Sequence, residues 1–537
     1  MNNVELVRER PAVFSQTPGK DPPQGGAPET SFSLECLAEA LDRVVRICPD
    51  LPLLAIPWIH IKHPIHPVQE ELILRPDRGE HGTGPGPAMV LRCVSRFFTS
   101  FIYAGYFMLR ILQVRLRYAG LLQRLKRGTF QIIAKTWRFE SSSGSEDFYY
   151  GDLQERLAKR GVRMLMLYGY PRGRSWEGFR SSARGMGWEL PELCLVSLLS
   201  PLRFACQQLR TSFRLMRLAR NERGLVRSIA RRAAWDCLSF RNLPIALYDG
   251  ITRHAVSLWH PAALLTLYEG HAWEKSAWAA ARAKDPSCKI IGYQHTILLP
   301  HQLALFRERG RSPLTAKPDV VLCLGPRTQQ MLGPSHRQSR LVPFGSFRKS
   351  DKARGPVYPD PRKQTVLVLP EGHLEEMKCM FDTAMRAAVH LPEYRFILRC
   401  HPIFGSPVEQ VGPTLEVDPA SLPNVEFSTG RWVEEDFAKS SVVLYRGSSA
   451  ILYALLFGLK PIYLHDEILR DSDPLFELTE WRQEVSSIAE LTQSLRAYAQ
   501  ADAGQLIGEW ETAKEYVSSY VGNVEEGSID RLLEALS

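Results

Sequence analysis

The amino-acid sequence predicts two α/β domains in tandem, each built on a parallel sheet. Apolar runs of strand length alternate with helical segments, and this alternation occurs twice, on either side of a polar, Pro- and Gly-containing segment at residues 348–362. Such alternation is typical of parallel sheets with crossover helices. The length of 537 residues also exceeds what one hydrophobic core usually organises.

Composition narrows the class of protein. The chain is 45% hydrophobic and 23% charged, with a net charge of +9, which indicates affinity for anions such as nucleotides, anionic lipids or nucleic acid. No recognised nucleic-acid-binding module accompanies the basic segments, so nucleic acid is not an expected partner. The ten cysteines form no C-x-x-C pair, and the N-terminus carries no apolar signal segment. We therefore expect a reduced, cytoplasmic protein.

The N-terminal region is expected to be an extension of the first domain. Residues 1–33 have the composition of a disordered tail. Residues 34–128 begin with apolar segments such as Leu51–Ile61, continue through a linker at 76–88, and end with a basic helical stretch from Val90 to Gly128. Within that stretch, Phe97–Leu109 is too short to cross a bilayer but long enough for a buried or interfacial helix. The stretch would either lie on an anionic membrane surface, peripheral on the inner membrane, or pack on the domain with its arginines in water.

The first α/β domain is predicted over residues 129–347. Its strand candidates are Val162–Tyr168, Ala263–Leu267, Lys289–Tyr293 and Val320–Leu324, and its helix candidates are Asp152–Arg160, Trp273–Ala283 and a helix starting near Arg327. Residues 202–232 are predicted to be helical and contain nine arginines against one acid. They would form a solvated face or help to hold a phosphate-bearing acceptor.

The second α/β domain is predicted over residues 363–537, with long helices at the C-terminus. Its strand candidates are Thr365–Leu369, Arg395–Arg399, Val442–Tyr445 and Pro461–Leu464. Apolar residues at Leu374, Met377, Phe381, Ala384 and Ala388 form a helical stripe, and Ala450–Phe457 is a helix that ends at Gly458.

Three loops of the second domain could bind a nucleotide, because ligands of parallel sheets bind beyond the carboxyl ends of the strands. They contain Glu371 and Gly372, then Arg399 and His401, then Arg446, Gly447, Ser448 and Ser449. Gly447 would let a ligand approach the backbone, and the paired hydroxyls could donate to a phosphate. The alternative is structural, with His401 bonded to backbone and the serines acting as helix caps.

The order of these loops carries a family resemblance. A strand followed by His-Pro, and then, about forty-five residues later, a strand, a Ser-Ser pair, a helix and Gly-x-x-Pro, resembles the donor domain of bacterial sialyl- and polysialyltransferases. It also resembles Kdo transferases of capsule synthesis and, more loosely, CDP-glycerol polymerases of teichoic-acid synthesis. The resemblance implies a GT-B fold of two Rossmann-like domains, with His401, Ser448 and Ser449 holding the phosphate of a cytidine nucleotide.

The catalytic candidates follow strands of the first domain. Glu269 lies in Tyr-Glu-Gly-His, which is similar to the acidic-Gly motif that supplies the general base in the sialyltransferase families, although Tyr268 replaces the first acid. Glu274 is a second acid, and either could instead stabilise a helix N-terminus. His295 is the competing base, since it resembles the histidine of CDP-glycerol polymerases, with Thr296 where glycine is usual. Contact with the acceptor or the donor is the role that we favour for it.

The sequence therefore predicts a glycosyltransferase of bacterial surface-carbohydrate or capsule synthesis. Its partners would be a nucleotide-sugar donor, most favourably a CMP-activated nonulosonic acid (sialic-acid-like or Kdo-like), and a glycan or lipid-linked glycan acceptor. No cofactor and no metal are expected. Asp471–Asp473 matches D-x-D, the metal-binding signature of the other major glycosyltransferase fold, but it is discounted because it lies in a polar loop of a different type of domain. The alternatives are a CDP-alditol phosphotransferase and a non-catalytic nucleotide- or glycan-binding pair of domains.

Overall fold

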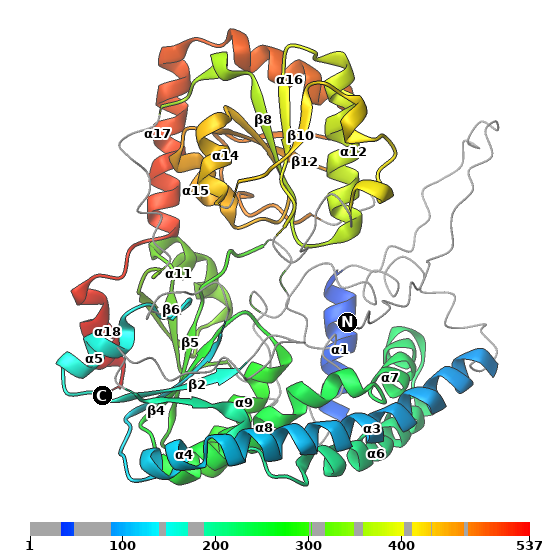
Figure 1. Cartoon of the computed structure of the whole chain (residues 1–537), viewed down its shortest axis with the longest axis vertical. Coiled ribbons are helices and arrows are strands. Elements are labelled where there is room, and N and C mark those ends of the chain that lie inside the picture. Colours follow the sequence, from blue (N-terminus) through cyan, green and yellow to red (C-terminus); the bar gives the residue numbers. More distant parts are fainter. Residues whose placement is uncertain are drawn as a thin grey trace.

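The computed structural model describes residues 34–47, 87–138, 147–169, 187–299, 302, 305, 317–347, 358–401, 411–430, 432–466 and 471–536. Two α/β domains lie one above the other in Figure 1, the first below and the second above. Every pairing between named strands is parallel. The predicted pair of Rossmann-like α/β domains is thus confirmed by the sheets.

The first domain contains a seven-stranded sheet in the order β3-β2-β1-β4-β5-β6-β7. Its strands are β1 (Ile132–Trp137), β2 (Met164–Gly169), β3 (Glu189–Pro191), β4 (Ala263–Leu267), β5 (Lys289–Tyr293), β6 (Val320–Cys323) and β7 (Arg340–Pro343). The crossover helices include α5 (Leu153–Lys159), α8 (Leu243–Trp259), α9 (Ala272–Lys284) and α11 (Pro326–Leu332). Four of these strands were predicted within two residues of their bounds, whereas β1, β3 and β7 were not.

The second domain contains a six-stranded sheet in the order β10-β9-β8-β11-β12-β13. Its strands are β8 (Thr365–Leu369), β9 (Arg395–Leu398), β10 (Val425–Phe427), β11 (Val442–Tyr445), β12 (Lys460–Leu464) and β13 (Gln483–Val485). They are covered by α12 (Leu374–His390), α14 (Val433–Lys439), α15 (Ala450–Leu456), α16 (Ile488–Gln500) and α17 (Ala503–Tyr520). The predicted apolar stripe of α12 is fully buried at Met377, Phe381 and Ala384.

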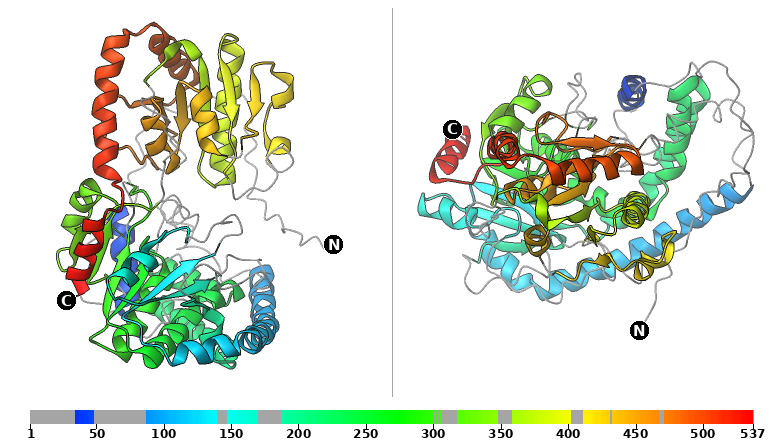
Figure 2. Two further views of the ribbon diagram at one scale, coloured as in Figure 1. Left: turned by 60° about the vertical axis from the view of Figure 1, so that its left-hand side comes forward. Right: turned by 90° about the horizontal axis from the view of Figure 1, so that it is seen from above.

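A helical layer flanks the first domain, formed by α1 (Leu34–Ile47), α3 (Pro87–Arg117), α4 (Ala119–Lys126), α6 (Ser200–Asn221) and α7 (Gly224–Asp236). The views in Figure 2 show α3 running along the outer side of this layer. In the described part of the chain, the window Val94–Arg117 is long and apolar enough to cross a membrane by length and composition, with a mean hydropathy of 1.3 and 22% of it buried. The apolar part of this helix is therefore longer than the thirteen residues Phe97–Leu109, which were predicted to be too short to cross a bilayer. The predicted segment Leu51–Ile61, the tail 1–33 and most of the linker 348–362 lie outside the described residues.

The C-terminus crosses back to the first domain, which corrects the predicted boundary. Helix α17 packs on the second domain through Trp510 and Val517, but Val524 and helix α18 (Glu526–Leu536) belong to the hydrophobic core of the first domain. Figure 1 shows this return, with the red α18 beside the first domain. The assignment of all of residues 363–537 to the second domain was therefore wrong for the last helix.

The edges at which the strands end in the two sheets face each other. Beyond β5 and β6, Ile297, Leu299 and Leu324 join the hydrophobic core of the second domain, and the backbone N–H of Leu298 donates to the hydroxyl of Tyr520 at 2.6 Å. Beyond β12, Glu477 pairs with Arg327 of α11 at 2.7 Å. Loops that follow strands in either domain therefore meet at the boundary between the domains.

Because the end of α17 crosses close to the start of α11, Gly325 should not accept an added methyl group. A Cβ added at Gly325 would lie 2.7 Å from the backbone carbonyl oxygen of Tyr520 and would also clash with that of Ser519. Gly325→Ala should lower the free energy of unfolding by roughly 1–3 kcal/mol through overpacking. Urea unfolding measures this change.

Gly333, at the other end of α11, is the matched control, because nothing lies within 4 Å of an added Cβ and its φ of −48° is helical. Gly333→Ala should leave the stability unchanged or raise it by up to about 1 kcal/mol. Indistinguishable unfolding curves for the two variants would contradict the close crossing of α17 over α11.

Candidate functional site

The first-domain site is built around a contact between the two rival bases. Glu269 follows β4 and His295 follows β5, and these strands are neighbours in the sheet. Glu269 Oε1 lies 2.9 Å from His295 Nε2, and both residues are buried. The sequence proposed these residues as alternatives, whereas the structure joins them in one carboxylate–imidazole pair.

A third residue, His271, completes this group. Its Nε2 lies 3.7 Å from Glu269 Oε2, and its side chain is 39% exposed, against 9% for that of Glu269. The ring of Tyr149 also packs edge-on against His295, with the ring centroids 4.7 Å apart. Sequence reasoning assigned no role to His271 or Tyr149. His271 stands two residues from Glu269 in the same loop, so its position was the available signal.

Glu274 has a structural position. It is completely buried, and its carboxylate accepts the backbone N–H groups of Glu269 and Gly270 at 3.0 and 2.9 Å. This acid of the first turn of α9 therefore fixes the loop that presents Glu269. Tyr268, which stands where the resembled motif has another acid, is buried and its hydroxyl lies 2.7 Å from His336 Nε2.

The second domain repeats this local arrangement. Glu-Gly-His-x-x-Glu occurs at residues 269–274 and again at 371–376, each time between a strand and a helix. The N–H of Glu371 donates to Glu376 at 3.0 Å, as the N–H of Glu269 does to Glu274. A histidine then follows the neighbouring strand in each domain, His295 after β5 and His401 after β9. The sequence contains this repeat in full, and it was missed.

The loops predicted to hold the nucleotide converge in part. A Cβ at Gly372 would lie 3.0 Å from His401 Nδ1, and a Cβ at Gly447, whose φ is +55°, would clash with the carboxylate of Glu371. The residues Glu371, Gly372, His401 and Gly447 therefore lie together. Burial lowers the pKa of His401 from its ordinary value of 6.5, while the nearby Glu371 carboxylate opposes that shift.

The paired serines border this group. Ser448 is half-buried and Ser449 is exposed. The helix that follows them, α15, has only seven residues. The Ser448 hydroxyl accepts the N–H of Ala450 at 3.4 Å, which is a local contact of the turn.

Two arginines assigned to the nucleotide are held in buried pairs instead. Arg446 is completely buried, with its Nε 3.8 Å from Glu376 and its guanidinium bonded to the Leu464 carbonyl. Arg399 pairs with Asp436 and donates to the Ser428 hydroxyl at 3.0 Å. Both arginines therefore fix the loops around His401 and Gly447, and the side chain of Arg446 has no exposed surface.

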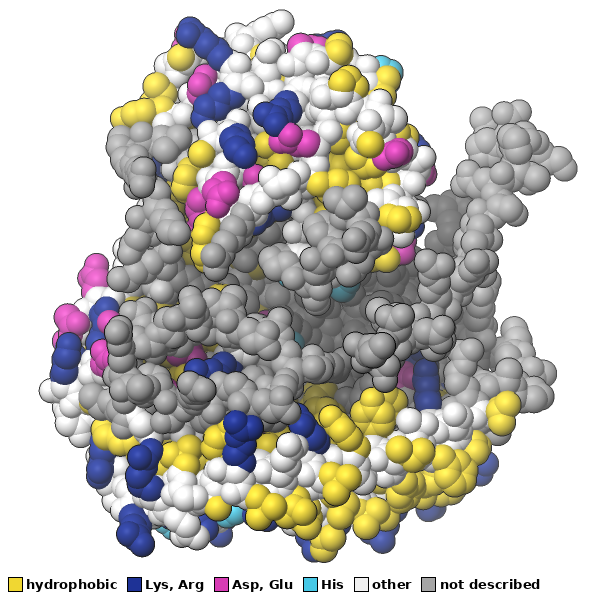
Figure 3. Space-filling view, in the orientation of Figure 1, with side chains coloured by type: hydrophobic (Ala, Val, Ile, Leu, Met, Phe, Trp, Pro, Cys, Tyr) yellow, Lys and Arg dark blue, Asp and Glu magenta, His cyan; other side chains and the backbone are white. Residues whose placement is uncertain are grey.

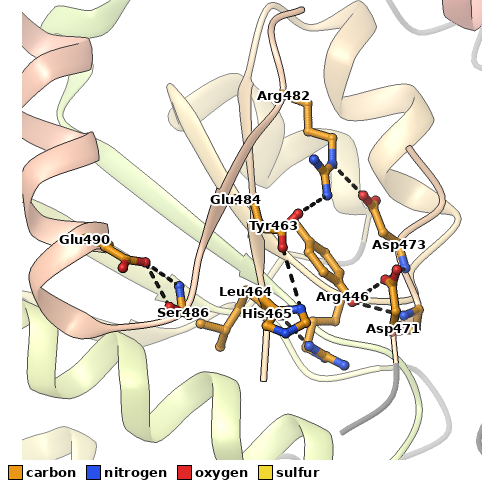
Figure 4. A network of polar contacts seen from close by, with 11 residues as sticks. Arg446, Tyr463, Leu464, His465, Asp471, Asp473, Arg482, Glu484, Ser486 and Glu490 are labelled. Carbon is orange, nitrogen blue, oxygen red and sulfur yellow. Dashed lines mark hydrogen bonds and ion pairs between the residues drawn. The ribbon is translucent and has the colours of Figure 1, made fainter. Parts of the chain in front are cut away.

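Figure 4 shows the network around the D-x-D segment. Asp473 is completely buried and accepts a hydrogen bond from Arg482 at 2.5 Å. It also accepts one from the Tyr445 hydroxyl at 2.7 Å. Burial raises the pKa of its carboxyl group, against the opposing effect of Arg482. Asp471 accepts from the Tyr463 hydroxyl at 2.9 Å. Within the described ranges, no group of three His, Cys, Asp or Glu side chains could hold a metal ion.

Comparisons with known proteins give no family. No protein-family model matches the chain, and no curated protein matches it. Solved structures are similar at low levels. The glycotransferase of kitacinnamycin has 12% identity and a TM-score of 0.43 over 76% of this chain and 100% of its own. The trehalose 6-phosphate synthase from Burkholderia multivorans has 10% identity and a TM-score of 0.44 over 76% and 98%. The UDP-GlcNAc 2-epimerase from Neisseria meningitidis, bound to UDP-GlcNAc, has 12% identity and a TM-score of 0.42 over 75% and 99%.

Proposed function

We propose that this protein transfers a sugar from a nucleotide donor to a hydroxyl group of an acceptor, with the reaction at the boundary between its two domains. The observation that carries the proposal is the buried Glu269–His295 pair, 2.9 Å apart, on the edge of the first sheet that faces the second domain. A carboxylate in contact with an imidazole is suited to accept a proton from a hydroxyl group. Glu371, Gly372 and His401 lie beyond the corresponding edge of the second sheet.

The proposed reaction balances as one displacement. The acceptor oxygen attacks the anomeric carbon of the donor, the bond from that carbon to the phosphate oxygen breaks, and the nucleotide leaves with the electron pair. The hydroxyl proton passes to Glu269, whose other contacts to His295 and His271 stabilise the carboxylate before transfer. His401 in its protonated form would pair with the departing phosphate.

For the donor we propose a CMP-activated nonulosonic acid, and for the acceptor a growing surface glycan in the cytoplasm. The support is the order of the His401-Pro402 and Ser448-Ser449 loops, which resembles cytidine-dependent transferases. A CDP-alditol phosphotransferase remains the second candidate, because His295, its expected base, is a member of the same pair as Glu269.

The first prediction concerns which nucleotide the protein binds most tightly. Calorimetry of the full chain against CMP, CDP, UMP, UDP and GDP should give the highest affinity for a cytidine nucleotide. A panel of activated donors, scored by the nucleotide released, then tests transfer. Tighter binding of UDP or GDP contradicts the cytidine assignment, and binding of a nucleotide without any product identifies a non-catalytic protein.

The base assignment is tested by two conservative substitutions. Glu269→Gln keeps the size of the side chain and removes the proton acceptor, so turnover should fall by roughly 10²–10⁴-fold with nearly unchanged nucleotide affinity. His295→Asn should lower turnover less than Glu269→Gln does, because it removes a partner of the carboxylate and leaves the proton acceptor in place. If His295→Asn abolishes transfer while Glu269→Gln keeps near-native turnover, the histidine is the base and the CDP-alditol reaction is favoured.

The pH dependence of nucleotide binding tests His401. Its lowered pKa leaves it neutral at pH 7.5, and a bound phosphate favours the protonated form. Affinity should therefore rise as the pH falls towards and below 6.5, and His401→Gln should remove that part of the dependence. His390→Gln, an exposed histidine at the far end of α12, is the control and should follow the wild type. Parallel pH profiles for wild type and His401→Gln would exclude a phosphate contact at His401.

A further inference from the structure

An unusual share of the exposed large apolar side chains lies on one helix. In the described part of the chain, nine of them lie on α3, and five lie away from both α3 and α6. The other three are Leu199, which directly precedes α6, and Leu202 and Phe213, which lie on it. The most exposed are Phe213 at 73%, Ile102 at 72%, and Leu91 and Leu116 at 71% each. Figure 3 shows this apolar surface along the lower part of the first domain.

The exposed residues of α3 form a single stripe. We define the α3 stripe as Leu91, Val94, Phe98, Ile102, Tyr106, Leu109, Leu112 and Leu116. Their spacing of three and four residues keeps them on one side of a helix. At 1.5 Å per residue, the stripe is about 38 Å long. Such a continuous apolar face is unusual on the surface of a soluble domain and indicates an interaction surface.

The opposite side of α3 is fixed to the first domain. Ala104, Ile111 and Val114 are buried, and the Ser100 hydroxyl donates to the Leu238 carbonyl at 2.9 Å. The Tyr103 ring stacks on Phe240, with centroids 3.9 Å apart. The helix is therefore held flat along the domain. In this packing it can lie on a membrane but cannot cross one, because crossing would carry the polar surface of the attached domain into the hydrocarbon core.

The charges beside the stripe select an anionic occupant. Helices α3 and α4 contain no acidic residue, and Arg110, Arg117 and Arg124 are among the basic residues on them. The adjacent α6 has Arg203, Arg210, Arg214, Arg217 and Arg220 and also no acid. A second copy of the same surface would bring these like charges together, whereas an anionic lipid surface complements them.

We propose that the α3 stripe docks the first domain on an anionic phospholipid bilayer, with α3 in the plane of the interface. The apolar side chains enter the boundary between headgroups and acyl chains, and the flanking arginines contact lipid phosphates. Figure 1 shows α3 on the part of the first domain remote from the second domain, so docking leaves the boundary between the domains open. This inference is independent of the transfer reaction.

Vesicle co-sedimentation of the full chain tests the proposal. Wild type should bind vesicles of phosphatidylcholine with phosphatidylglycerol and bind those of phosphatidylcholine alone far more weakly. The triple variant Phe98→Gln, Ile102→Gln, Leu109→Gln should reduce the partition coefficient at least tenfold, because each replaced side chain is more than 60% exposed and would enter the lipid. Arg110→Gln and Arg117→Gln should each reduce it by about fivefold at low salt.

The matched control replaces three exposed apolar residues of the second domain, Tyr358→Gln, Val389→Gln and Trp432→Gln, and should bind as wild type does. Circular dichroism and urea unfolding verify that each variant is folded. Equal partition of the two triple variants overturns the proposal, as does wild type that binds neither kind of vesicle. The proposal is also overturned if the wild type forms a dimer and does not bind vesicles, and if the α3 triple variant is monomeric. That result assigns the α3 stripe to self-association.

Discussion

The direction of the parallel strands is the constraint on which the candidate site depends. All strands of a parallel sheet end at the same edge, so side chains that follow neighbouring strands are brought together whatever their distance in sequence. Glu269 and His295 meet in this way after β4 and β5, and Glu371 and His401 lie close after β8 and β9. Since loops beyond β5, β6 and β12 all reach the other domain, the two edges face one another, and both groups lie on surfaces turned towards the domain boundary.

The same sequence motif fixes the loop that contains Glu269 in the first domain and Glu371 in the second. In Glu-Gly-His-x-x-Glu, the second glutamate lies in the first turn of the following helix and accepts the backbone N–H of the first. The buried acid thus satisfies loop groups that would otherwise need water. In the second domain Glu376 also pairs with buried Arg446, which ties the Glu371 loop to the Gly447 loop. The loop geometry therefore depends on a buried acid in each domain and, in the second domain, also on a buried ion pair.

The sequence predicted the central strands well because continuous apolar runs such as Thr365–Leu369 suit a strand buried on both faces. It missed β1, in which Lys135 is buried against Glu192 at 3.0 Å and lies over the Trp137 ring, since a lysine interrupts the apolar pattern. It also missed the edge strands β3, β10 and β13, which have only three residues each. The roles of Arg399 and Arg446 depended on Asp436 and Glu376, partners that no local pattern identifies.

The return of the C-terminus has a consequence for how the chain is made. Domains of a growing chain generally fold in the order of their synthesis. Here the core of the first domain includes Ile529, Leu532 and Ala535, and Lys289 at the start of β5 donates to the Leu536 carbonyl at 3.0 Å. Those residues are translated after the whole of the second domain. The second domain can therefore acquire its complete core while the first, although translated earlier, still lacks part of its own. Nascent chains halted before α18 would hold an unfinished first domain beside a finished second one.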